Sequence, residues 1–161
     1  MSKKKIKSRE VKDINFTLTD LDGDPVEFSL VPLKQWVAAE VFHNVLTVLL
    51  NALGGAFGEG DEQKKIKMFI DAATNVLTFE KVRFLIEKMM NGAMVDDIEV
   101  DIDGMDVFEE NPHFIYLVLF HGVKGNWPNV FSKLGAKGSG FFSKVIKEAK
   151  AMTDTEAEAE V

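Results

Sequence analysis

Five residues between positions 99 and 110 have the types and spacing of a calcium-binding loop. Positions 1, 3, 5, 6 and 12 of the EF-hand pattern are filled here by Glu99, Asp101, Asp103, Gly104 and Glu110. In that pattern the carboxylates supply oxygen ligands to Ca²⁺, and the glycine permits the sharp turn of the loop.

Three features of this segment depart from the calcium-binding pattern. Position 1 holds a glutamate in place of the shorter aspartate, and position 8 holds Asp106 in place of an apolar residue. The incoming residues 98–102 alternate between apolar and acidic types, as in a strand rather than a helix. We therefore favour an acidic, solvated connection here, with a calcium-responsive binding module as the alternative.

A second group of carboxylates surrounds Gly23, at Asp20, Asp22 and Asp24. Aspartate side chains bond to nearby backbone amides, and glycine adopts backbone conformations that other residues avoid, so this composition is typical of a tight turn. A turn is favoured over a metal site.

The remaining residues show no catalytic pattern. His43, His113 and His121 form no H-E-x-x-H motif, and the chain contains no cysteine and no G-x-S-x-G serine elbow. The glycine stretches at 54–60 and 135–140 lack the Lys-Ser/Thr ending of a phosphate loop. We expect no enzyme activity, no cofactor and no catalytic or structural metal.

The elements that must position these residues follow from hydrophobic periodicity. Alternation at 14–19 and 26–30, with turn formers between, predicts a β-hairpin. Helical periodicity predicts five helices, at residues 33–53, 61–77, 79–90, 112–123 and 141–152. We expect Asn111 to cap the fourth of these helices before Pro112, and residues 125–128 to break it. The predicted fold class is mainly α: a helical bundle of about five helices with an N-terminal β-hairpin.

Length and composition fit one folded domain. The chain has 161 residues, of which 46% are hydrophobic and 28% charged, with a net charge of −7. We expect a basic flexible arm at 1–12, a single domain at 13–152 and an acidic flexible tail at 153–161. The acidic balance argues against nucleic-acid binding, and the polar residues within the most apolar stretch, 36–53, argue against a membrane span.

What remains for function is apolar surface. The helix predicted at 33–53 carries two adjacent apolar rows, so its apolar face is broad, and methionines cluster at 89–94. Methionine adapts to varied apolar partners, so a groove for a partner helix is one hypothesis and ordinary core packing is the other.

The order of elements resembles the tail assembly chaperones of tailed bacteriophages over residues 14–134. A hairpin leads through Leu-Val-Pro-Leu at 30–33 into a long apolar helix, and Leu-Thr-Phe-Glu at 77–80 opens another helix. That helix ends in Met-Met-Asn-Gly-Ala at 89–93. An acidic link then precedes an aromatic helix that closes with Val-Lys-Gly-Asn-Trp at 123–127.

This resemblance implies a non-enzymatic chaperone of the host cytoplasm that coats the tape-measure protein and helps bring tail-tube subunits to it. Its partners would be those two phage proteins, with further copies of the chain as a possible homo-oligomer. A structural protein of the tail, connector or baseplate is the alternative. The residues predicted to line the partner site are Trp36, Val37, Phe42, Leu46, Met89, Met90 and Met94.

Overall fold

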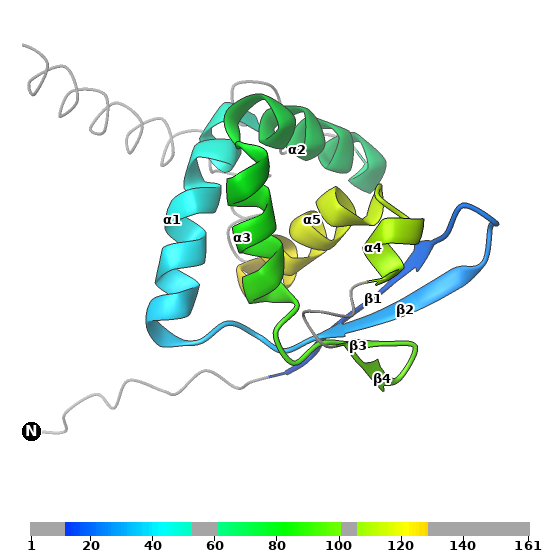
Figure 1. Ribbon diagram of the computed structural model, residues 1–161. Coiled ribbons are helices and arrows are strands. Elements are labelled where there is room, and N and C mark those ends of the chain that lie inside the picture. Colours follow the sequence, from blue (N-terminus) through cyan, green and yellow to red (C-terminus); the bar gives the residue numbers. More distant parts are fainter. Residues whose placement is uncertain (1–11, 53–60, 101–105, 129–161) are drawn as a thin grey trace, which may run out of the picture.

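The computed structural model describes residues 12–52, 61–100 and 106–128, and Figure 1 shows their arrangement. The strands are β1 (Ile14–Thr19), β2 (Pro25–Leu30), β3 (Met94–Val95) and β4 (Ile98–Glu99). The helices are α1 (Gln35–Ala52), α2 (Glu62–Val76), α3 (Phe79–Met89), α4 (Asp106–Glu110) and α5 (Phe114–Asn126).

The four strands form one antiparallel sheet in the order β1-β2-β3-β4. Phe16 pairs with Phe28 across β1 and β2, and their rings stack with centroids 5.2 Å apart. Because side chains alternate along a strand, this register puts the apolar residues of both strands on one face. The predicted hairpin is confirmed.

The turn of this hairpin is held by one aspartate. Asp20 Oδ1 accepts hydrogen bonds from the backbone N–H groups of Asp22 (3.0 Å) and Asp24 (2.8 Å). Gly23 adopts φ +87°, which only glycine tolerates readily. The aspartates at this position therefore build a turn, as predicted.

Helix α5 lies at the centre of the fold, between the sheet and helices α2 and α3 (Figure 1). Phe114 meets Phe28 of β2 edge to face at 5.6 Å, and Phe120 meets Phe69 of α2 at 5.5 Å. Because α5 carries apolar side chains around most of its circumference, it is stable only in the interior. This central helix carries three aromatic residues, Phe114, Tyr116 and Phe120.

Two of the predicted helix starts are confirmed by their caps. The Asp61 side chain accepts from the Lys64 N–H at 2.8 Å, and the Thr78 hydroxyl accepts from the Lys81 N–H at 3.3 Å. Each bond satisfies a backbone donor that lacks a partner within the first helical turn.

The predicted cap at Asn111 is wrong. The buried Asn111 side chain accepts from the Leu21 N–H at 3.2 Å, 90 residues away, and so fastens the β1–β2 turn to the segment before α5. Its backbone carbonyl accepts from Phe114 instead. The local sequence predicted Asn111 as a helix cap, but its side chain instead accepts a hydrogen bond from the distant Leu21 N–H.

The fold class needs correction from a helical bundle to a mixed α/β fold. The hairpin continues into a four-stranded sheet. Of the alternating residues 98–102, Ile98–Glu99 form strand β4, and the short helix α4 follows at Asp106–Glu110. Helix α5 also runs through Gly125, where a break was predicted, and the missing Cβ there lets the helix pack closely on Ile14 of β1. The helix predicted at 141–152 and the tail at 153–161 lie outside the described residues, as does the arm at 1–12 apart from Lys12.

Candidate partner-binding surface

The start of α1 is fixed by a buried asparagine at the end of α5. Asn126 Oδ1 accepts from the Leu33 N–H at 2.9 Å, and its Nδ2 donates to the Gly122 carbonyl at 2.8 Å. Leu33 is buried, and Gln35 then turns the chain through φ +52° into the helix. This sharp turn sets which side chains of the first helical turn face outward.

Trp36 is 86% exposed at the N-terminal end of α1, directly after this turn. The helix buries Val41, Val45 and Val48, and Trp36 lies away from that row. Val37, one turn before Val41, is 40% exposed. An exposed tryptophan beside a second apolar side chain is typical of a protein-binding surface, because tryptophan contributes strongly at interfaces.

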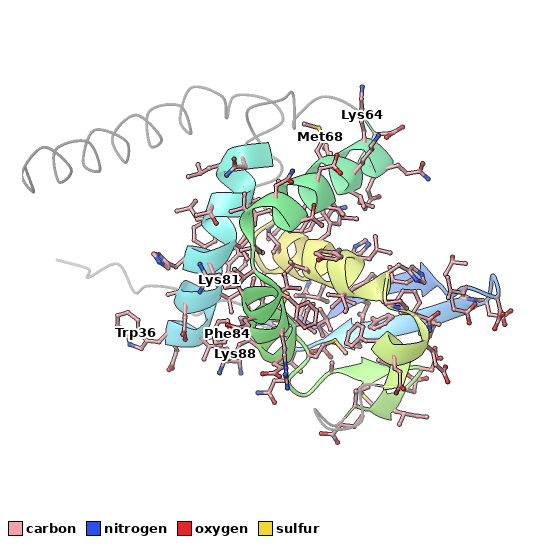
Figure 2. All side chains as sticks on the ribbon, turned by 45° about the horizontal axis from the view of Figure 1, so that its top comes forward. Trp36, Lys64, Met68, Lys81, Phe84 and Lys88 are labelled. Carbon is pink, nitrogen blue, oxygen red and sulfur yellow. The ribbon has the colours of Figure 1, made fainter. Side chains whose placement is uncertain are left out.

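Helix α3 packs beside α1 and presents a basic flank (Figure 2). Lys81, Phe84 and Lys88 follow one another at helical spacing, and Figure 2 shows them on the helix adjacent to the end of α1 that carries Trp36. Lys88 Nζ lies 5.5 Å from the centroid of the half-buried Phe84 ring, a cation–π contact. We name Trp36, Val37, Lys81, Phe84 and Lys88 the α1–α3 surface.

The seven residues predicted to line a partner site do not form one surface. Trp36 and Val37 are exposed on α1, while Met94 is 41% exposed in β3. Phe42 and Leu46 are half-buried, and the Phe42 ring meets Trp127 edge to face at 5.1 Å.

Met89 and Met90 lie in the core, with exposures of 1% and 0%. Met89 faces Gly122 of α5, where the absence of a Cβ leaves room for its sulfur atom. In this conformation these two methionines support the fold from within and are not open to a partner.

A second apolar feature, missed by the sequence analysis, lies on the opposite flank of α3. A hollow of about 200 Å³ opens there, and we name it the α3–α5 groove. Its lining residues are Phe79, Val82, Arg83, Ile86, Glu87, Phe108 and Ile115. The sequence feature that could have predicted this groove is the position of Phe79 and Phe84, which lie outside the buried row of α3, on either side of it.

Among the described residues, two ion pairs lie on the surface, Arg83–Glu87 and Lys124–Glu62. Lys124 Nζ lies 2.9 Å from Glu62 Oε1, and this hydrogen bond lowers the pKa of the Glu62 carboxyl. Burial lowers the pKa of the His121 imidazole, which stacks on Phe16 with ring centroids 4.6 Å apart. The causes of the two shifts are thus the ion pair with Lys124 and the burial of the imidazole ring.

The predicted calcium pattern falls only partly within the described residues. Glu99 is exposed in β4 and Glu110 is exposed in α4, while residues 101–105 lie outside the description. Within residues 12–52, 61–100 and 106–128, no group of three or more histidines or carboxylates is placed to hold a metal ion. In the same residues, no helix is both long and apolar enough to cross a membrane.

The described chain is therefore a small mixed α/β protein with an exposed aromatic and basic surface. It belongs to the phage tail assembly chaperone family. The sequence model described as "Phage tail assembly chaperone protein, TAC" matches residues 23–141, which confirms the resemblance found from the order of elements. No curated protein and no solved structure matches the chain.

Membership of this family supports a role in tail assembly and implies interaction with other phage tail proteins. It also suggests a non-enzymatic role.

Proposed function

We propose that this protein binds the tape-measure protein through the α1–α3 surface, keeps it soluble and helps to recruit tail-tube subunits in the host cytoplasm. The observation that carries the proposal is Trp36, which stays 86% exposed although the core around it is closed. The family match supplies the tail-assembly context.

The chemistry of the surface fits a helical client. Trp36, Val37 and Phe84 offer apolar contacts to an apolar stripe, while Lys81 and Lys88 offer charge to carboxylates beside that stripe. Several copies bound along one long client would act as weak sites in series, so avidity would replace tight binding at a single site.

The test is co-expression of the tape-measure protein with wild-type chain or with Trp36→Ala, followed by measurement of soluble client and pull-down. We expect Trp36→Ala to fold normally and to weaken client binding by about tenfold or more, as truncation of an interface tryptophan does. Leu21→Ala is the matched control, because Leu21 is 73% exposed but lies in the β1–β2 turn.

Two results would contradict the proposal at different levels. If wild-type protein does not bind the client or raise its solubility, the proposed function is wrong. If it does, but Trp36→Ala acts like Leu21→Ala, the function stands and the α1–α3 surface is not the site.

A further inference from the structure

The α3–α5 groove is apolar and open to solvent. Phe79 at its edge is 70% exposed, whereas Val82 and Phe108 within it are buried. An apolar hollow of about 150 Å³ in another protein accepts a benzene molecule. The hollow here, about 200 Å³, therefore has room for an aromatic side chain from outside the described residues.

Helix α4, which contributes Phe108 to the groove, is acidic, whereas α3 carries charges of both signs. Arg83 is already paired with Glu87 at 3.0 Å, and Glu80, Glu109 and Glu110 are exposed on α3 and α4. The lysines of α3, Lys81 and Lys88, follow its other flank. A segment that is apolar on one side and basic on the other would match this groove in both respects.

Residues 141–152 of the same chain have that chemistry. Helical spacing puts apolar side chains on one face, at Phe141, Phe142, Val145, Ile146 and Ala149. Lysines supply the polar side, at Lys144, Lys147 and Lys150, with Glu148 as the single acid.

The segment is long enough to reach the groove. Helix α5 contributes Ile115 to the groove and ends at Asn126, about 17 Å further along at the helical rise of 1.5 Å per residue. The intervening residues 129–140 span up to about 40 Å when extended. We propose that residues 141–152 form an amphipathic helix that docks on the α3–α5 groove of the same chain, with Phe142 in the hollow.

The absence of cysteine makes a direct test possible on the full chain. A nitroxide attached to Lys147→Cys, on the polar side of the segment, broadens the NMR signals of residues near it. We expect loss of the amide signals of Phe79, Ile86 and Ile115, and recovery after reduction with ascorbate. The signals of Leu21 and Trp36 should persist, because these residues lie in the β1–β2 turn and on the α1–α3 surface.

A pair of variants separates specific docking from general proximity. Phe142→Asp in the labelled chain should restore the signals of the groove residues. Ser143→Asp adds the same charge one position along, on the polar side, and should leave the broadening unchanged. The proposal is overturned if the wild-type groove signals persist, or if Phe142→Asp does not restore them.

A second sample tests whether the segment of one chain docks on the groove of another copy. It mixes spin-labelled chain that contains no ¹⁵N with ¹⁵N-enriched chain that carries no nitroxide. Broadening of the groove signals in that mixture means that the segment docks on a second copy, which also overturns docking within one chain. Neither result depends on the tape-measure protein, so the outcome is separate from that of the proposed function.

Discussion

At the scale of single residues, two buried asparagines connect parts of the chain that lie far apart in sequence. Asn111 bonds to Leu21, and Asn126 bonds to Leu33 while also donating to Gly122. The Leu33 N–H is buried and would be costly to leave without an acceptor, whereas the Leu21 N–H is only partly buried. The second of these connections lies just before α1, the helix that carries the exposed Trp36.

Asn126→Ala is expected to destabilise the protein by about 1–3 kcal/mol, because the buried Leu33 N–H loses its acceptor. Urea unfolding of both proteins measures the difference. Asn51→Ala is the control, since exposed Asn51 makes the same type of bond to Thr47 four residues earlier without a distant partner. Its effect should remain within about 0.5 kcal/mol. Equal effects of the two changes would refute the role given to Asn126.

His121 makes the stability depend on pH. Burial lowers its pKa in the folded protein, so on acidification the unfolded chain binds the proton first, near its ordinary pKa of about 6.5. The free energy of unfolding should therefore be highest above that pH and fall as the pH drops toward the folded pKa.

His121→Phe keeps a ring against Phe16 but removes the titration. Unfolding curves measured across this pH range should be flatter for the variant than for the wild type. Parallel curves would show that His121 contributes nothing to the pH dependence.

At the scale of elements, the packing of α5 against the sheet depends on close approach. A Cβ at Gly125 would collide with all three outer carbons of Ile14, whereas a Cβ at Gly122 would meet the sulfur of the flexible Met89 side chain. Ile14 is β-branched and belongs to a paired strand, so it has less freedom to move.

Gly125→Ala should therefore destabilise by about 1–3 kcal/mol through overpacking, in spite of a helix-propensity gain of about 1 kcal/mol. Thermal unfolding measures it, and Gly122→Ala is the matched comparison with the smaller expected cost. In the Ile14→Ala background the cost of Gly125→Ala should largely disappear. If it persists there, contact with Ile14 is not its cause.

At the same scale, helix α3 has three sides that take part in different contacts. Its buried row packs on the core, its Lys81–Phe84–Lys88 flank joins the α1–α3 surface, and its Phe79 flank forms the α3–α5 groove. A single amphipathic stripe explains only the first of these. The other two depend on Phe84 and Phe79, which lie beside the stripe and form surfaces only together with residues of α1, α4 and α5.

At the scale of the whole molecule, the closed core and the family membership together favour a protein that acts on tail proteins through its surface. A chaperone that acts only during assembly should be abundant in infected cells and depleted from mature particles. Quantitative mass spectrometry of purified virions and of assembly intermediates measures this ratio. A fixed, abundant copy number in mature virions would instead support a structural tail, connector or baseplate protein.

The sequence by itself determined the local elements of the fold. The hairpin, the turn at Asp20, the starts of α2 and α3 and the aromatic helix α5 all follow from periodicity and capping chemistry. The family also followed from the order of these elements. These features were predictable because each is set by side chains and backbone groups within a few residues of one another.

Only the tertiary structure decided which apolar residues reach solvent. Met89 and Met90 have the same types and spacing as a partner-binding cluster, yet both are buried, Met89 against Gly122 of α5, while Trp36 stays exposed on α1. The sheet formed by β3 and β4 and the rerouted Asn111 side chain likewise depend on distant contacts. Burial is a property of neighbours brought together by folding, and a pattern along one helix does not contain it.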